Sequence, residues 1–297
     1  MRLFLVDSSI FIFRAWYGPE RERVNLQQQP NQAFVGFSDF VFRLLTEQAP
    51  RRLVFAFDES LSKSARKEIY SSYKANRSPA PVDLKRQFAW CRQWLEGLGI
   101  TCVSSTRWEA DDLIGSLAHY HGSVRLPVAI LTADKDLAQL INEQDIWWNY
   151  LDGKKLDYRS ICKKYGVRPE QIADQLALAG DKVDNIPGIP QIGPKTVARL
   201  LKKYDSIDNL RRHLHEVGEM NFRYAGNVQR SLIEHEALLD ISPLLTRINR
   251  EIKEMQQVDT GRRAADVAAL TRMMHEQAFD NTRSTRWQSY LGADGRE

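Results

Sequence analysis

The sequence predicts an α/β fold in which a mostly parallel central sheet is flanked by helices and followed by a helical lobe. Short apolar runs rich in β-forming residues alternate with longer segments that carry apolar residues at helical spacing. Strands that alternate with helices are typical of a parallel sheet covered on both faces. The five predicted strands are Leu3–Asp7, Leu53–Asp58, Ile100–Ser104, Val128–Asp134 and Ile146–Leu151.

The helical patterns divide the chain into three parts. Between the strands, helices are predicted at Gln32–Thr46, Val82–Gly97 and Ala110–His119. After about Arg168 the pattern changes to short helices at Gln171–Ala179, Lys195–Lys203, Ile207–His215 and Asn227–Leu239. The last forty or so residues are polar, with one weak helical pattern at Ala264–Glu276. We therefore expect an α/β domain at 1–168, a helical lobe at 169–255 and an extension at 256–297.

Composition indicates an ordinary soluble protein of the reducing interior of a cell. The 297 residues are 43% apolar and 27% charged, with a net charge of +4. The apolar run Met1–Val6 is too short for a signal peptide, and no stretch approaches membrane-spanning length. Cys91, Cys102 and Cys162 are odd in number and form no C-x-x-C pair, which argues against a disulfide framework or a zinc ribbon. We expect a cytoplasmic protein with no membrane partner.

Acidic residues gather where predicted strands and helices begin or end. Asp7, Asp58 and Asp134 each end a predicted strand, and the carboxyl ends of parallel strands meet at one edge of a sheet, where ligands bind. The complete set is Asp7, Asp58, Glu109, Asp111, Asp112, Asp134, Asp136, Asp181 and Asp184. Oxygen ligands without His or Cys suit Mg²⁺ or Mn²⁺ rather than zinc. Two groups of such ligands would hold two metals, an arrangement that hydrolyses phosphodiesters.

Each acidic cluster also has a purely structural explanation. Glu109, Asp111 and Asp112 fit the first turn of a helix, where the helix dipole favours acids. Asp134 and Asp136 fit a solvated turn. Acids at a helix C-terminus, as expected for the Asp181 cluster, oppose the dipole. Because separate elements bring these acids to one edge, the metal-site interpretation explains the set better than separate structural roles do.

Two basic segments are candidates for phosphate binding. Residues 63–77 read KSARKEIYSSYKANR, in which cations alternate with tyrosines that could stack on bases. A solvated charged helix is the alternative, but the segment follows directly after Asp58. The second candidate, residues 188–196, fails the context of a P-loop because it follows a helix and a turn. A helical hairpin fits better, with Pro194 at the first helical position and Lys195 beside free N–H groups, although an ordinary helix–turn–helix connection is possible.

Taken together, these motifs resemble those of the 5′-nuclease family. The segments LVDSSIFIFRAWY, FAFDES, YKANRSPAP, EADDLIG, TADKDLAQL and GDKVDNIPGIPQIGPKTVARLL occur in the family's order over roughly residues 1–205. The sequence is most similar to the 5′→3′ exonuclease domain attached to bacterial family-A DNA polymerases, and is similar to phage and cellular flap endonucleases. The resemblance implies a PIN-like sheet, a helical arch at about 60–82 over the active site, and a helix–hairpin–helix variant that grips duplex DNA.

The resemblance also implies a role for individual residues. The nine acids match the family's metal ligands, Lys74 and Arg77 match arch cations near the scissile phosphate, Arg66 matches another arch cation, and Tyr73 matches a base-stacking residue. A K⁺ ion is implied at the backbone carbonyls of Leu178, Ala179, Pro187, Ile189 and Ile192. DNA is expected to contact the hairpin at Gln191, Ile192, Gly193, Pro194, Lys195 and Thr196. Ser71 and Ser72 depart from the Pro-Glu usual in polymerase-linked members, without removing a charge or a ligand.

The sequence therefore leads us to expect a free-standing, monomeric, Mg²⁺-dependent 5′→3′ exonuclease and 5′-flap endonuclease. It would use two metals, for which Mn²⁺ could substitute, and would act on DNA in replication or repair with a DNA polymerase in trans. The main alternative is a protein that binds DNA forks or flaps with little or no cleavage. A PIN-type ribonuclease is a weaker alternative, because such proteins lack the hairpin lobe.

Overall fold

A six-stranded sheet forms the centre of the computed structural model, which describes residues 1–19, 22–59 and 64–294. The strands are β1 (Leu3–Asp7), β2 (Arg52–Asp58), β3 (Thr101–Ser105), β4 (Val128–Leu131), β5 (Ile146–Asn149) and β6 (Lys154–Leu156). Their order is β3-β2-β1-β4-β5-β6, and all neighbours are parallel except β5 and β6. The predicted mostly parallel sheet is confirmed.

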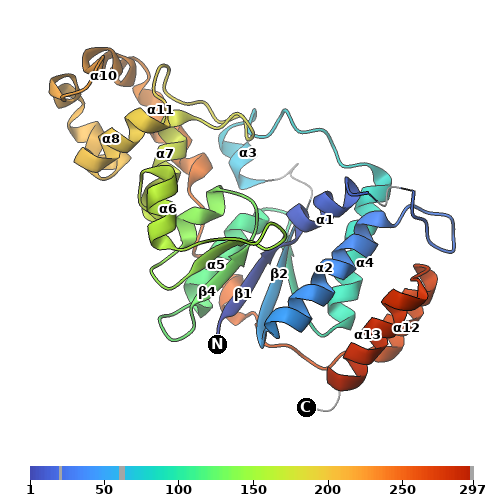
Figure 1. Ribbon diagram of the computed structural model, residues 1–297. Coiled ribbons are helices and arrows are strands. Elements are labelled where there is room, and N and C mark those ends of the chain that lie inside the picture. The colour runs from blue at the N-terminus through green and yellow to red at the C-terminus, as the bar shows by residue number, and fades with distance from the viewer. Residues whose placement is uncertain (20–21, 60–63, 295–297) are drawn as a thin grey trace.

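Helices cover both faces of this sheet because its central strands are apolar on both sides. In β1, Phe4 and Val6 face the core shared with α1 (Ser8–Trp16), α2 (Gln32–Gln48) and α4 (Val82–Gly97), whereas Leu3 and Leu5 face the core shared with α5 (Ala110–His121). The parallel strands run upward in Figure 1 from the N-terminus toward α3 (Ala65–Ile69). Their carboxyl ends therefore lie at the edge beneath α3.

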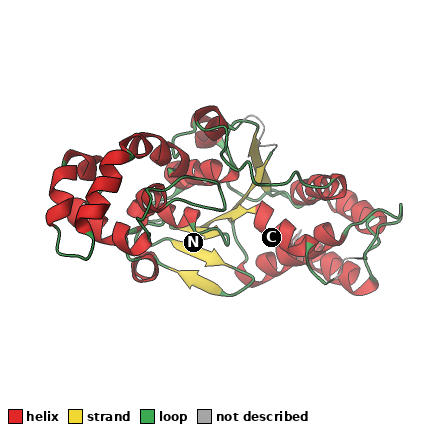
Figure 2. Cartoon of the chain, turned by 90° about the horizontal axis from the view of Figure 1, so that it is seen from above, coloured by secondary structure: helices red, strands yellow, loops and turns green. Residues whose placement is uncertain are grey.

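The predicted helical lobe is present, with differences in its segments. It follows α6 (Tyr158–Tyr165) and contains η3 (Pro169–Gln171), α7 (Ile172–Ala179), α8 (Pro194–Tyr204), α9 (Ile207–Arg212), η4 (Leu214–Glu219), α10 (Ala225–Glu234) and α11 (Glu236–Thr246). The single helix predicted at Asn227–Leu239 is two helices that meet at His235, where φ is −117°. Figure 2 shows the lobe at one end of the molecule, with the sheet in the middle.

The C-terminal extension contains more helix than its polar sequence predicts. After η5 (Lys253–Gln257), helices α12 (Val267–Glu276) and α13 (Asn281–Asp294) lie beside α2 and α4 (Figure 1). Helix α13 was not predicted because Trp287, Tyr290 and Leu291 are the only large apolar or aromatic residues of a polar segment. The Trp287 ring lies 4.9 Å from that of Trp94 and 5.1 Å from that of Phe42, so tertiary packing supplies what the helix's own sequence lacks.

An ion-pair cluster fixes α13 on the same surface. Arg283 contacts the Asp39 carboxylate of α2 at 3.0 Å, and Arg286 contacts the same carboxylate.

Within the described ranges, no helix has both the length and the apolar composition needed to span a membrane.

We predict that Trp287→Ala lowers the free energy of unfolding by about 3–5 kcal/mol, because a fully buried indole is replaced by a cavity. Urea denaturation followed by circular dichroism measures the change. Val124→Ala is the control: Val124 is 75% exposed, so the shift should stay within about 0.5 kcal/mol. Equal effects of the two substitutions would show that α13 contributes little to the core.

Candidate active site

Two of the predicted acids end neighbouring strands and are held there by hydroxyl and amide donors. Asp7 is the last residue of β1 and accepts a hydrogen bond from the Thr132 hydroxyl at 3.0 Å. Asp58 is the last residue of β2, and accepts from the Ser9 hydroxyl at 3.1 Å and from the Ala110 N–H at 2.9 Å. The Asp58 carboxylate therefore lies at the N-terminus of α5, where the helix dipole favours negative charge.

Asp134 and Asp136 lie beyond the end of β4. The strand was predicted to run to Asp134 but ends at Leu131, since the Thr132 hydroxyl accepts the Asp134 N–H at 3.0 Å and turns the chain. The Asp136 N–H then donates to the Asp134 carboxylate at 2.9 Å. One buried carboxylate oxygen, Oδ1 of Asp136, has no hydrogen-bond partner. Such an oxygen is costly to bury without a cation or a donor, and it fits a divalent-ion ligand.

The acids at this edge perturb one another. Burial, together with the charges of Asp58 and Asp134, raises the pKa of the Asp7 carboxyl to about 8. Burial and the charge of Asp134 likewise raise the pKa of Asp136 to about 8. The pKa of Asp111 lies well above its usual range because of burial and the charges of Asp134 and Asp7. Without a cation, the charged forms of these groups are therefore disfavoured, as expected for acids brought together around an ion.

Glu109 opens helix α5 and is surrounded by donors from the basic segment. It is the N-cap residue of a capping box with Asp112, so the structural explanation considered for this cluster also applies. The Lys74 ammonium contacts it at 2.5 Å, and the Tyr73 and Ser64 hydroxyls donate to it at 3.1 and 3.3 Å. Burial alone would raise the pKa of Glu109, but Lys74 and Arg66 lower it below its usual range.

Asp112 and Arg66, expected to be a metal ligand and a DNA-binding arch cation, bind each other in this structure. Nη1 and Nη2 of Arg66 donate to the two Asp112 carboxylate oxygens at 2.6 and 2.7 Å. Asp112 is 1% exposed and Arg66 is 8% exposed. Both carboxylate oxygens therefore face the guanidinium, and both side chains are buried.

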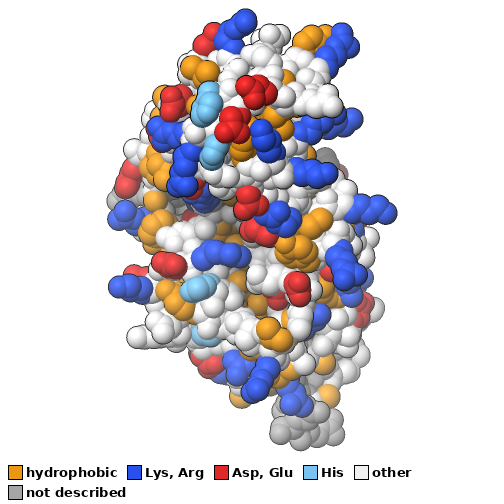
Figure 3. Space-filling view, turned by 90° about the vertical axis from the view of Figure 1, so that its left-hand side faces the viewer, with side chains coloured by type: hydrophobic (Ala, Val, Ile, Leu, Met, Phe, Trp, Pro, Cys, Tyr) orange, Lys and Arg blue, Asp and Glu red, His pale blue; other side chains and the backbone are white. Residues whose placement is uncertain are grey.

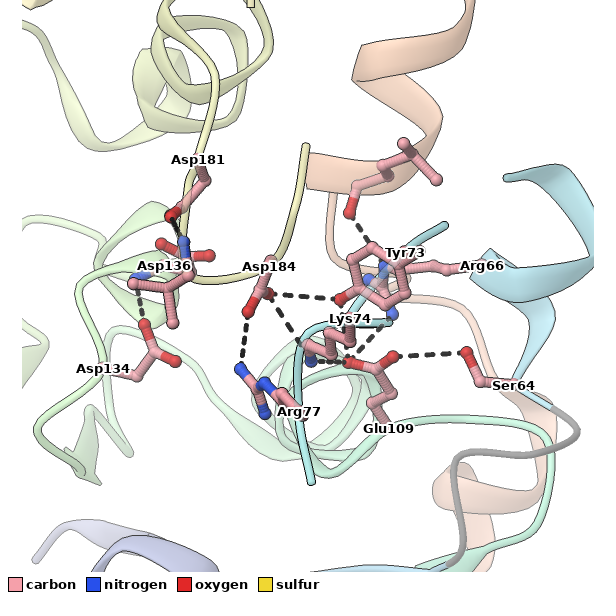
Figure 4. A network of polar contacts seen from close by, with 12 residues as sticks. Ser64, Arg66, Tyr73, Lys74, Arg77, Glu109, Asp134, Asp136, Asp181 and Asp184 are labelled. Carbon is pink, nitrogen blue, oxygen red and sulfur yellow. Dashed lines mark hydrogen bonds and ion pairs between the residues drawn. The ribbon is translucent and has the colours of Figure 1, made fainter. Parts of the chain in front are cut away.

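The expected arch is folded down onto the acids (Figure 4). Residues 60–63 of the expected range 60–82 lie outside the described residues, and α3 is the only α-helix in the described remainder of the arch before Val82. Lys74 lies 3.6 Å from Asp184, and Arg77 lies 2.5 Å from the other oxygen of that carboxylate. Tyr73 is 3% exposed and hydrogen-bonds Glu109 and Asp184. Its ring is therefore covered in this structure, although a base-stacking residue was expected at this position.

Lys135 is a further cation of the site that sequence reasoning missed. Its ammonium contacts the Asp181 carboxylate at 2.7 Å. Its place between Asp134 and Asp136 was the available signal.

Within residues 1–19, 22–59 and 64–294, no three His, Cys, Asp or Glu side chains are grouped closely enough to hold one ion. Amino and guanidinium groups pair with Glu109, Asp181 and Asp184 instead, while Asp7, Asp111, Asp134 and Asp136 carry the raised pKa values.

The hairpin expected to bind DNA lies between α7 and α8. A side chain at Gly188 would collide with the Ala179 carbonyl, because a Cβ there would lie 2.4 Å from its oxygen. Pro194 is the first residue of α8, as predicted, and Gly193 precedes it as the N-cap. Gln191, Gly193, Pro194 and Lys195 are exposed and Thr196 is half-buried. The Ile192 side chain is buried, so only its backbone could meet a ligand.

Two serines from later helices hold this hairpin, and no local pattern marked them as functional. Ser231 of α10 donates to the Pro190 carbonyl at 2.8 Å, and Ser242 of α11 donates to the Pro187 carbonyl at 3.1 Å. Among the carbonyls expected to hold K⁺, that of Leu178 accepts the Ile189 N–H at 2.8 Å and that of Ile189 accepts the Ile192 N–H at 3.1 Å. Each oxygen retains a second lone pair.

Known structures share this fold over nearly the whole chain. A phage T5 5′-exonuclease with bound zinc ions matches with a TM-score of 0.68 at 17% identity, over 94% of this chain and 98% of that one. The catalytic core of Rad2 in complex with DNA substrate matches with a TM-score of 0.65 at 17% identity, over 98% and 92% of the two chains.

Sequence relatives are more similar. A 5′–3′ exonuclease of Aquifex aeolicus is 37% identical over 208 residues, which are 70% of this chain and 71% of the relative. A 5′–3′ exonuclease of Buchnera aphidicola is 32% identical over 84% of this chain and 87% of the relative. DNA polymerase I of Rhizobium leguminosarum is 36% identical over 74% of this chain, but the match spans only 22% of that longer protein.

Family models cover most of the sequence in two consecutive pieces. Residues 2–166 match the 5′–3′ exonuclease N-terminal resolvase-like domain, and residues 167–267 match the 5′–3′ exonuclease C-terminal SAM fold. Together with the relatives above, they show that the chain belongs to the 5′–3′ exonuclease family.

Proposed function

We propose that the protein is a Mg²⁺-dependent 5′→3′ exonuclease and 5′-flap endonuclease that hydrolyses DNA phosphodiesters. Family membership supports the nuclease activity. The observation that carries the more detailed proposal is the set of mutually perturbing carboxylates at the sheet edge, directly beneath a cationic segment. The same proposal includes a monomer in the cytoplasm that works with a DNA polymerase in trans.

The acids would form two overlapping groups, which share Asp134, and each group would hold one divalent ion. Burial raises the pKa of both Asp7 and Asp136. The charges of Asp58 and Asp134 raise the pKa of Asp7 further, and those of Asp134, Asp181 and Asp184 raise the pKa of Asp136 further. Asp111 belongs with the first group, since burial and the charges of Asp134 and Asp7 raise its pKa. Bound Mg²⁺ or Mn²⁺ would activate water and stabilise the leaving oxygen. The phage T5 relative of known structure binds zinc ions, which supports a divalent-metal site in this fold.

The cations of the arch would bind the scissile phosphate. Lys74 and Arg77 pair with Glu109 and Asp184 through contacts of 2.5 Å each. An incoming phosphate offers the same kind of oxygen acceptor, so these cations can transfer to it while the acids bind metal. Lys74 would then stabilise the charge that develops on the phosphate oxygens during hydrolysis.

The hairpin and the helical lobe would hold the duplex. Gly193, Pro194 and Lys195 form the exposed N-terminus of an 11-residue helix, where N–H groups and the dipole favour a DNA phosphate. Figure 3 shows many Lys and Arg side chains distributed over the face of the molecule that includes the lobe. The Rad2 core was solved with its DNA substrate, which supports DNA binding by this fold. A K⁺ ion at the hairpin carbonyls is part of the same proposal.

The direct test is cleavage of a labelled 5′-flap, a nicked duplex and an RNA-primed duplex, with Mg²⁺ and with a chelator. We expect Mg²⁺-dependent products from the 5′ end or the flap junction. Asp134→Asn should abolish cleavage and leave substrate binding within about threefold, because it removes a metal ligand without disturbing the hairpin. Tight flap binding by the wild-type protein with no Mg²⁺-dependent product would favour the non-cleaving alternative, and cleavage restricted to RNA would favour a ribonuclease.

Lys74→Ala is predicted to slow the chemical step about 100-fold, as expected for removal of one donor that stabilises transition-state charge. Single-turnover kinetics with saturating enzyme measure this step apart from binding. Lys67→Ala is the matched control, because it removes a lysine of the same basic segment from α3 and should leave the rate unchanged. An unchanged rate for Lys74→Ala would remove this residue from the catalytic set.

A further inference from the structure

A buried ion pair joins the arch to the catalytic helix. Arg66 lies on α3, at the base of the arch, and Asp112 lies in the first turn of α5, which also carries Asp111. Two parallel hydrogen bonds of 2.6 and 2.7 Å connect them, the bidentate geometry in which a guanidinium binds a carboxylate most strongly. We propose that Arg66 and Asp112 are a positioning pair, which sets the acids of α5 in place and binds neither metal nor DNA.

Further hydrogen bonds join the pair to the C-terminal end of α11 and to the residues that follow it. Nε of Arg66 donates to the Leu245 carbonyl at 2.9 Å, and Nη2 donates to the Arg247 carbonyl at 3.1 Å. The Asn249 N–H donates to the Asp112 carboxylate at 2.9 Å. The pair therefore fixes α3, α5 and residues 245–249 relative to one another.

Residues 245–249 extend this connection to the other half of the acid site. Arg247 contacts the Asp174 carboxylate of α7 at 3.1 Å. Helix α7 ends at Ala179, and the chain after it carries Asp181 and Asp184. One continuous set of polar contacts thus runs from the helix that holds Asp111 to the helix that leads into the second group of acids.

The pair differs from Asp136, one of the proposed metal ligands, in how its charges are satisfied. The Asp112 oxygens are both occupied by Arg66, and backbone N–H groups add further bonds. In contrast, one buried oxygen of Asp136 has no hydrogen-bond partner. A carboxylate that is fully satisfied inside the protein offers little to an ion, whereas one that is unsatisfied gains by binding it.

The test compares Arg66→Gln, Asp112→Asn and the double variant in which both changes are combined. Each single change leaves one buried charge without its partner, whereas the double variant leaves neutral side chains that can still hydrogen-bond. We expect each single variant to unfold at a lower urea midpoint than wild type when a metal chelator is present. We also expect each to slow single-turnover flap cleavage at least tenfold. The double variant should recover most of both losses.

Asp111→Asn is the matched control, one residue away on the same helix. Because it removes a proposed metal ligand, its cleavage defect should persist when Arg66→Gln is added. With a metal chelator present, Asp111→Asn should not lower the urea midpoint of unfolding, because this change relieves repulsion among the acids. The half-maximal Mg²⁺ concentration should stay within about twofold of wild type for the double variant of the pair and rise for Asp111→Asn.

The inference rests on the proposed function, but the outcomes separate the two. A folded double variant that cleaves as slowly as the worse single variant would overturn the positioning pair, because a lost ligand or DNA contact cannot be restored by a second loss. If the wild-type protein cleaves nothing, the proposed function fails, while the urea midpoints in the chelator still decide whether the two residues are coupled.

Discussion

Repulsion among carboxylates at one edge of the sheet is the constraint on which the site depends. Parallel strands bring Asp7 and Asp58 to this edge, and the turn after β4 and the start of α5 add further acids. Burial removes the water that would screen their charges, so the pKa values of Asp7 and Asp136 rise to about 8. The protein can keep these groups ionised near neutral pH only by bringing cations to them.

The cations present in the structure come from segments far apart in the sequence. Lys74 and Arg77 reach the acids from the arch, and Lys135 reaches them from the turn after β4. They neutralise Glu109, Asp184 and Asp181, while Asp7, Asp111 and Asp136 keep raised pKa values. Divalent ions would complete the neutralisation and release the arch cations for the phosphate. The carboxylates would then exchange the arch cations for divalent ions, and the arch cations would exchange the carboxylates for the phosphate of the substrate.

The sequence was sufficient for the features that periodicity and topology determine. Strand ends predicted Asp7 and Asp58 at one edge, and Pro194 marked the start of α8. Side-chain direction was beyond it: Arg66 and Asp112 have the residue types of a DNA contact and a metal ligand, but they are turned toward each other. Helix α13 was missed because its stability comes from the contact of Trp287 with distant aromatic rings. Ser242 acts through a tertiary contact that no local pattern reveals, whereas Lys135 was missed although it stands between two of the predicted acids.

The most direct measurement is anomalous scattering from crystals of the protein soaked in Mn²⁺. We expect manganese among the carboxylates of Asp7, Asp134 and Asp136, with the Lys74 ammonium displaced from Glu109. Manganese bound only at other surfaces, with the present ion pairs intact, would contradict it.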